Sequence, residues 1–291
     1  MKLRKPIKTF LPIAVFAVLS VIAFYFYGSR DVSLSKIRKT KTIKIGYAIE
    51  APYAFLKGNN EVGGQSPDIA KYVAQKLGIE KIEWKQTEFS MLFSDLQQGR
   101  IDVVAAGTFI TPERAEIVNF SEPIFHVNQG LLVLKGNPRK LNSYGNFVEM
   151  PEVKVAVISG SVEERFLRRT GVSDKQIISV PDALTGRVAV EAGNADCLAL
   201  SSPTVNWMAI KDQLGKTETA QISEQVADLP PGFSGYGAFA FRKKDVALLN
   251  EWNAVLKQFV GTEEYKKIVA EYGFTDSELP GNITTAEVLK K

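Results

Sequence analysis

The residues best suited to chemistry lie in the stretch AAGTFITPERAEIVNFSEPI, which starts at residue 105. Gly107 would allow a bound molecule to approach the backbone closely at the end of an apolar strand. Thr111 is placed to cap a helix that begins at Pro112, and Arg114 falls in the first turn of that helix. An arginine beside helix N-terminal amides can bind a carboxylate by two parallel hydrogen bonds. The alternative is that Arg114 only pairs with a surface acid.

The sequence contains few other residues or motifs that are typical of catalytic, metal or nucleotide sites. There is one histidine, His126, and one cysteine, Cys197, and the motifs GxSxG, GxxxxGK[ST] and GxGxxG do not occur. Metal, triad and nucleotide chemistry are therefore disfavoured, and no cofactor is expected. A hydrolase with two carboxylates is compatible with the composition, although the spacing of the acids does not point to one. We interpret His126 as a structural or surface residue and Cys197 as a buried apolar one.

Strands and helices alternate along the chain in an order that would position these residues. TIKIGYAI, IDVVAAG and VKVAVISG are typical of buried strands. SPDIAKYVAQKLG predicts a helix with Ser66 as its N-cap, and SVEERFLRRTG predicts another with a capping box formed by Ser161 and Glu164. This alternation predicts an α/β fold with doubly wound sheets, in which ligands bind beyond the carboxyl ends of the strands.

A partial internal repeat divides the chain into two halves. LQQGRIDVVAAG and VEAGNADCLAL both contain a helix end, Gly-x-x-Asp and an apolar strand. Strand-like segments at 130–136 and 235–243 bracket the second unit. We therefore expect two lobes, with the chain crossing between them twice. Lobe 1 would comprise 42–130 and 238–285, and lobe 2 would comprise 131–237 with hinge strands at its ends.

The N-terminal segment 1–30 has the features of an export signal or a membrane anchor. Its basic residues precede an uncharged run from Phe10 to Tyr27, and the nearest small-x-small cleavage site is Ser33-Leu34-Ser35. Cleavage and retention both stay open, and residues 31–41 are expected to form a solvated linker. After residue 30 the chain has 31 basic and 32 acidic residues, so its body offers no charge for binding nucleic acid.

Several segments, in order, resemble the family 3 extracytoplasmic solute-binding proteins that serve ABC transporters. They are IGYAIEAPYAF, GGQSPDIAKYVAQKLG, LQQGRIDVVAAG, FITPERAE, GSVEERFL and YGAFAFRK, and the resemblance covers nearly all of residues 42–288. It implies two α/β lobes joined by a two-strand hinge, a small zwitterionic ligand and an ABC permease as partner. Arg114 would match the arginine that binds the ligand carboxylate. It also implies an exported protein, with membrane contact only through an uncleaved N-terminal segment.

Two departures from the amino-acid binders of this family narrow the expected ligand. Phe109 replaces a small hydroxyl residue, and Ser201 replaces the aspartate that binds the α-ammonium. An added ring and a lost acid suit a delocalised cation held by aromatic faces. The chain most resembles the ectoine and hydroxyectoine binders, in which Glu50 would match the acid for the ring N–H groups and Tyr53, Phe89 and Phe109 the aromatic walls. Ser161 would match a contact made on closure.

Two other function classes stay open from the sequence. One is a polar amino-acid binder of the same family, in which Glu50 would bind the ammonium group. The other is an enzyme, because the same fold includes periplasmic cyclohexadienyl dehydratases. We expect a binding protein without catalytic residues, since the three aromatic residues have no evident use in that reaction.

Overall fold

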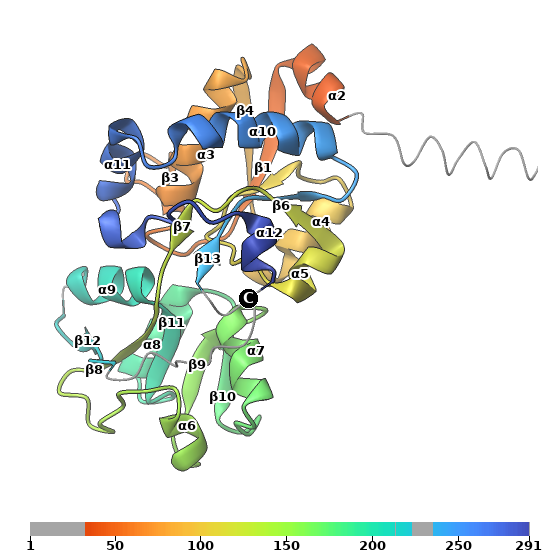
Figure 1. Cartoon of the computed structure of the whole chain (residues 1–291). Coiled ribbons are helices and arrows are strands. Elements are labelled where there is room, and N and C mark those ends of the chain that lie inside the picture. The colour runs from red at the N-terminus through yellow and green to blue at the C-terminus, as the bar shows by residue number, and fades with distance from the viewer. Residues whose placement is uncertain (1–32, 213, 223–234, 291) are drawn as a thin grey trace, which may run out of the picture.

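The computed structural model describes residues 33–212, 214–222 and 235–290. The expected export signal or anchor at 1–30 lies outside the described residues. Two lobes, each built on a five-stranded sheet, are joined by two short strands (Figure 1). The α/β fold with two lobes is therefore confirmed. No helix within the described ranges combines the length and apolar character that a membrane span requires.

The lobe 1 sheet has the strand order β4-β1-β5-β14-β6. β1 runs parallel to β4 and β5, whereas β14 runs antiparallel to β5 and β6. The strands are β1 (Thr42–Tyr47), β4 (Lys81–Gln86), β5 (Val103–Val104), β6 (Val118–Phe120) and β14 (Ala240–Arg242). A small hairpin, β2 (Phe55–Leu56) with β3 (Val62–Gly63), precedes the first long helix.

The lobe 2 sheet has the order β10-β9-β11-β8-β12 and repeats the plan of three parallel strands with antiparallel neighbours. Its strands are β8 (Gln129–Leu134), β9 (Val155–Ile158), β10 (Ile177–Val180), β11 (Cys197–Ser201) and β12 (Thr217–Thr219). Its helices are α6 (Asn146–Glu149), α7 (Val162–Arg169), α8 (Ala183–Glu191) and α9 (Ser202–Ile210). Cys197 is fully buried in β11, as expected.

The strands that join the lobes are β7 (Phe125–His126) and β13 (Tyr236–Gly237), which pair antiparallel (Figure 1). The His126 and Tyr236 rings stack with centroids 4.1 Å apart, which agrees with a structural role for the histidine. The loop that precedes Arg114 in lobe 1 is hydrogen-bonded to this hinge. Ile110 N–H donates to Tyr236 O at 2.8 Å, and Ala238 N–H donates to Thr108 O at 3.0 Å. A movement of the hinge would therefore also move this loop.

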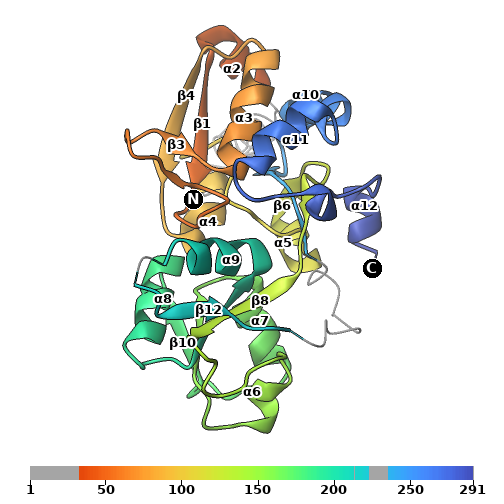
Figure 2. The ribbon, with the colours of Figure 1, turned by 90° about the vertical axis from the view of Figure 1, so that its left-hand side faces the viewer.

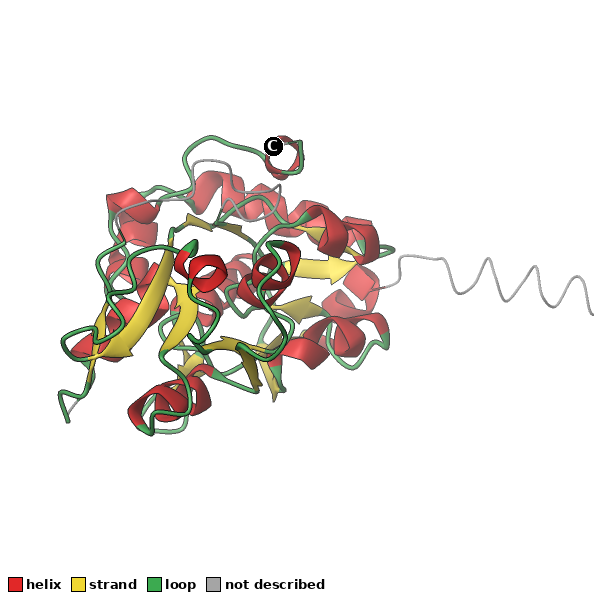
Figure 3. Cartoon of the chain, turned by 90° about the horizontal axis from the view of Figure 1, so that it is seen from below, coloured by secondary structure: helices red, strands yellow, loops and turns green. Residues whose placement is uncertain are grey.

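The remaining helices of the first lobe cover both faces of its sheet (Figures 2 and 3). They are α3 (Gln65–Lys76), η1 (Phe89–Met91), α4 (Leu92–Gln97), α5 (Pro112–Ile117), α10 (Val246–Phe259), α11 (Glu263–Ala270), η2 (Asp276–Glu278) and α12 (Thr285–Val288). Trp252 of α10 is fully buried against Phe239 and Phe241. Helix α12 is held beside the hinge, because Thr285 N–H donates to Glu122 Oε2 at 2.8 Å.

The Gly-x-x-Asp repeat has the same structural role in both lobes. Gly99 and Gly193 follow helices with φ values of 70° and 73°, a conformation that glycine adopts without strain. Asp102 then accepts a hydrogen bond from Lys44 N–H at 3.1 Å, and Asp196 accepts one from Lys154 N–H at 2.8 Å. Each aspartate thus ties the start of its own strand to the neighbouring parallel strand.

The linker expected over residues 31–41 is wrong for most of its length. Helix α2 (Ser33–Thr40) occupies it and packs on α10 and β1. Ile37 is buried, and Ser33 Oγ donates to Asp245 Oδ1 at 2.6 Å. Asp245 also pairs with Arg242, whose Nε lies 2.6 Å from Oδ2. The basic residues of this segment face solvent, which is why the short apolar stripe beneath them escaped the sequence analysis.

Candidate functional site

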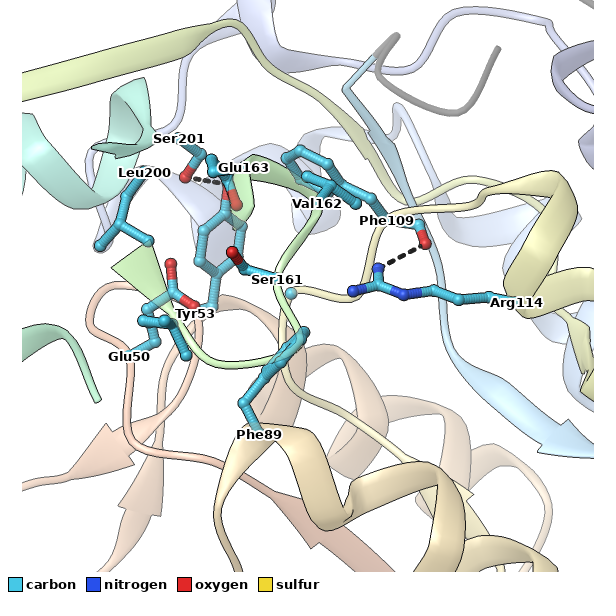
Figure 4. Close-up of a pocket in the computed structure, with 12 residues that line it drawn as sticks. Glu50, Tyr53, Phe89, Phe109, Arg114, Ser161, Val162, Glu163, Leu200 and Ser201 are labelled. Atoms are coloured by element: carbon cyan, nitrogen blue, oxygen red, sulfur yellow. Dashed lines mark hydrogen bonds between the residues drawn. The ribbon is translucent and has the colours of Figure 1, made fainter. Parts of the chain in front are cut away.

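A cavity lies between the two lobes and is lined by twelve residues (Figure 4); about 330 Å³ of its space is not filled by atoms, and this includes the part open to solvent. The structure brings together all eight residues that the sequence analysis proposed for the site: Glu50, Tyr53, Phe89, Gly107, Phe109, Arg114, Ser161 and Ser201. Four further lining residues escaped it: Ile158, Val162, Glu163 and Leu200. The cavity lies at the carboxyl ends of β5, β9 and β11, where open α/β sheets bind ligands.

Arg114 is fixed by the local structure that its sequence predicts. Thr111 caps α5 by accepting a hydrogen bond from Arg114 N–H at 3.2 Å. The guanidinium donates to Phe109 O at 2.9 Å and, across the cleft, to Gly160 O of lobe 2 at 3.1 Å. Its Nε is buried, and no group in the described part of the chain accepts a hydrogen bond from it. Arg114 is also one of the residues that line the cavity.

Burial, and secondarily the positive charge of Arg165, lower the pKa of Arg114 to about 9, so the guanidinium stays charged at neutral pH. Its charge faces the rings of Phe89 and Phe93, each with its centroid 5.4 Å from Cζ. Such contacts between a cation and aromatic faces offset part of the cost of burying the charge. Arg114 is consequently a rigid, positively charged group that is held in the first lobe.

The aromatic residues of the cavity differ in their supports. Phe89 opens the short helix η1, and its ring lies against Arg114. Phe109 forms an isolated β-bridge with Gly237 of the hinge, and its ring lies 5.9 Å from that of Phe125. Both are more than nine-tenths buried and still line the cavity.

Tyr53 combines core packing with a contact across the cleft. Its ring packs on Phe125 and Phe274 with centroid distances of 5.0 and 5.6 Å. Its hydroxyl donates to Ser201 Oγ of lobe 2 at 3.0 Å (Figure 4). Gly107 makes this position possible, because a Cβ there would stand 2.5 Å from the Tyr53 ring, and its φ is 62°.

The predicted N-cap role of Ser66 is wrong. Helix α3 begins at Gln65, with Gly64 as its N-cap, so Ser66 lies inside the first turn. Its hydroxyl instead accepts a hydrogen bond from Gly107 N–H at 3.2 Å. Ser66 therefore supports the backbone of the cavity wall from behind.

Glu50 faces the cavity from the side opposite to Arg114 (Figure 4). Its side chain is partly buried, and Oε1 accepts a hydrogen bond from Thr204 Oγ1 of lobe 2 at 2.8 Å. Burial raises the pKa of Glu50 to about 8, against the lowering effect of the Thr204 hydrogen bond. A carboxylate in this environment would be stabilised by a cation of the ligand.

The expected capping box at Ser161 forms only in part. Ser161 caps α7 by accepting a hydrogen bond from Glu164 N–H at 3.1 Å, but the Glu164 carboxylate accepts from Gly160 N–H at 2.7 Å instead of from Ser161 N–H. Ser201, at the end of β11, is the N-cap residue of α9 and contacts Thr204 Oγ1 at 3.3 Å. Both serines bring helix N-termini of lobe 2 to the cavity.

Glu163 is the most consequential residue that the sequence analysis missed. It lies in the first turn of α7 and is only 4% exposed. The buried face of α7 contains Glu163, Phe166 and Leu167, at the spacing of an apolar stripe. A carboxylate on the apolar face of a helix is the signal that could have identified it.

The sequence profile of the bacterial extracellular solute-binding proteins, family 3, matches residues 43–275. The chain belongs to this family. A relative from Sinorhizobium fredii, named a probable amino-acid ABC transporter periplasmic-binding protein, is 33% identical to this family 3 protein over 279 residues. The alignment covers 94% of this chain and 91% of the relative.

Solved structures place the family 3 protein among two kinds of relatives. The crystal structure of EhuB in complex with hydroxyectoine is 26% identical, with a TM-score of 0.80 over 89% of this chain and 98% of that one. An ancestral amino-acid-binding protein, AncCDT-1, a precursor of cyclohexadienyl dehydratase, is 30% identical, with a TM-score of 0.71 over 82% of this chain and 99% of that one. The protein is thus similar both to an ectoine-type binder and to an amino-acid binder.

Proposed function

We propose that this protein is the solute-binding component of an ABC importer and that it captures a small zwitterion by closure of its lobes. Arg114 binds the carboxylate of the ligand, and Glu50 binds the cationic end. The observation that carries this proposal is the opposed pair itself: the guanidinium of Arg114 and the carboxylate of Glu50 line one cavity from opposite sides. A molecule with both charges would stabilise both groups at once.

Ectoine or hydroxyectoine is the first candidate for the ligand. Both carry a carboxylate and a cyclic amidinium, and the delocalised charge of an amidinium suits the faces of Phe89 and Phe109. The similarity to EhuB supports the same ligand class. Gly107 and Ser161 would supply backbone and hydroxyl contacts, and Ser201 replaces the acid expected for a primary ammonium.

A polar amino acid is the second candidate, which the relatives named as amino-acid binders favour. In that case Glu50 binds the α-ammonium. The two candidates are separated by thermal shift over a panel of ectoine, hydroxyectoine, glutamine, arginine and histidine, followed by calorimetry on each positive compound. Stabilisation by ectoine alone supports the first candidate, and stabilisation by an amino acid alone supports the second. If no compound of the panel raises the melting temperature, the proposed ligand class is wrong.

Export across the cytoplasmic membrane accompanies this proposal. The relative from Sinorhizobium fredii is named a periplasmic-binding protein, and segment 1–30 carries the basic and apolar parts of an export signal. Mass spectrometry of the N-terminus of the native protein tests it. A mature chain that lacks the apolar run indicates cleavage, whereas an intact chain in the membrane fraction indicates an anchor; an intact chain in the cytoplasm contradicts export.

A further inference from the structure

Glu163 is the charged residue of the cavity to which the proposed function gives no role. It reaches the cavity from α7 of lobe 2, whereas Glu50 follows β1 of lobe 1. The cavity lining therefore contains two carboxylates, one from each lobe, and a single guanidinium, that of Arg114. A ligand carboxylate that occupies Arg114 would leave both acids without a full positive charge.

The surroundings of Glu163 compensate its charge only in part. Burial raises the pKa of Glu163, while its own backbone N–H, the Ser161 hydroxyl and the charges of Arg114 and Arg165 lower it to a smaller extent. The same imbalance holds at Glu50, where repulsion from Glu163 exceeds attraction by Arg114. Bringing the lobes together therefore places two carboxylates in a poorly solvated space, at a cost in free energy.

We propose that Glu50 and Glu163 form a two-carboxylate clamp that binds the cationic end of the ligand from opposite lobes. The proposal deepens the proposed function and rests on it for the orientation of the ligand. The matching chemical class is a planar, delocalised cation with at least two N–H donors, that is, an amidinium or a guanidinium. Its spread charge and separate N–H groups allow two acids to share it, while the rings of Phe89 and Phe109 are present beside the cavity.

The clamp gives Glu163 a second effect, on closure itself. Glu163 and Glu50 line the cavity from different lobes, so closure of the cleft brings the two carboxylates together and removes water from between them. A bound cation offsets that loss, whereas the empty cleft does not. The cation binds the closed form more tightly than the open form, and its binding therefore shifts the equilibrium toward the closed form.

The first test compares the ligand affinity of Glu163→Gln with that of the wild type by calorimetry, with ectoine and L-arginine as the probes. Glu152→Gln is the matched control, because it makes the same chemical change at an exposed position of lobe 2. We expect Glu163→Gln to weaken the binding of whichever probe the wild type binds by tenfold or more, and Glu152→Gln to change it less than twofold. Affinity of Glu163→Gln within twofold of the wild type would overturn the clamp.

Glu163→Asp separates the charge of Glu163 from its reach and guards against a misfolded variant. It keeps the carboxylate but shortens the side chain by one methylene, so we expect a smaller loss than for Glu163→Gln. Melting temperatures near that of the wild type for all three variants show that the losses arise at the site. An Asp variant that binds more weakly than the Gln variant would contradict a role for the charge.

A second measurement needs no ligand and keeps the clamp testable by itself. The distance between the lobes is measured by paired spin labels on the exposed surfaces of the unliganded wild type and Glu163→Gln. We expect the variant to populate shorter distances, because closure no longer removes water from a charged group. An unchanged distribution would overturn the effect on closure. If the wild type binds neither ectoine nor L-arginine, the class of cation assigned to the clamp is wrong, whereas the proposed function is decided by the full ligand panel and the effect of Glu163 on closure by this distance comparison.

Discussion

Tyr53 of the first lobe donates a hydrogen bond from its hydroxyl to Ser201 Oγ of the second lobe, over 3.0 Å. The hydrogen bonds from Thr204 to Glu50 and from Arg114 to Gly160 also cross the cleft beside the cavity. The ring of Tyr53 belongs to the core of lobe 1. The same residue therefore stabilises one lobe through its ring and the closed arrangement through its hydroxyl.

Replacing Tyr53 by phenylalanine separates these two roles. The ring contacts with Phe125 and Phe274 stay, so we expect little change in the melting temperature of the unliganded protein. The closed form loses one hydrogen bond, worth about 0.5–1.5 kcal/mol, and ligand affinity falls by a similar amount. Calorimetry and thermal unfolding on the same variant check this. A large loss of thermal stability with unchanged affinity would contradict it.

Arg114→Ala should abolish tight binding. Removal of the guanidinium leaves the ligand carboxylate unpaired in a closed cavity, at a cost of about 2–5 kcal/mol in binding free energy. Folding should change less, because within the described part of the chain the side chain of Arg114 donates hydrogen bonds to two carbonyl groups alone. Arg114→Lys is the matched control, since it keeps the charge without the planar fork. Wild-type affinity in the alanine variant would remove Arg114 from the site.

The aromatic residues test the contact with a delocalised cation. Phe89→Ala and Phe109→Ala should lower the affinity for ectoine, while Phe→Tyr or Phe→Trp at either position should keep most of it, because the π face carries the attraction. If both residues serve only the core, Phe→Ala should instead lower stability by about 3–5 kcal/mol and Trp should be poorly tolerated. A Phe109→Ala variant that melts lower yet binds ectoine normally would disprove the aromatic contact.

Gly107→Ala should damage the site through its wall. The added Cβ would stand 2.5 Å from the Tyr53 ring, and the φ of 62° disfavours any residue with a side chain. We expect a stability loss of about 1–3 kcal/mol. Gly99→Ala is a useful comparison, because its φ is similar at 70° and no atom lies within 4 Å of the added Cβ. Equal losses in the two variants would show that the contact with Tyr53 adds nothing.

The raised pKa of Glu50 predicts that the stability of the protein depends on pH. The pKa of Glu50 is raised to about 8 from its ordinary value of 4.5, so the folded, closed protein binds a proton that the unfolded chain releases. This contribution is complete below about pH 4.5 and is lost as pH rises toward 8. The melting temperature of the unliganded protein should fall more between pH 5 and 8 in the wild type than in Glu50→Gln. Parallel curves would contradict it.

Local signals account for what could be predicted from the sequence. Thr111, Pro112 and Arg114 are joined by rules that act within one helical turn, and the structure confirms their arrangement. Strand and helix alternation likewise indicates the two-lobed fold. Ser66 shows the limit of such rules, because the tertiary contact with Gly107 N–H decides what its hydroxyl binds. A local capping preference is too weak to determine the helix start against that packing.

The role of Tyr53 and the place of Glu163 depend on contacts between segments far apart in the chain. Tyr53 meets Ser201 across 148 residues of sequence, and no spacing rule predicts that hydrogen bond. Glu163 lies in the first turn of α7, at the end of the helix that meets the cavity, which the helix pattern alone does not show. Helix α2 was not predicted for a related reason. Ser33 donates a hydrogen bond to Asp245, which lies 212 residues away in the sequence.

The docking of helix α2 fixes which lobe would be nearest to the membrane if the N-terminal segment is kept. The uncharged run ends at Tyr27, and only residues 28–32 separate it from Ser33, which is bonded to Asp245. Five residues span at most about 18 Å when fully extended. An uncleaved protein would therefore hold lobe 1 against the bilayer on a short tether and leave lobe 2 as the half that swings. Cleavage after Ser35, in contrast, would cut through α2 and remove the hydroxyl that Asp245 binds.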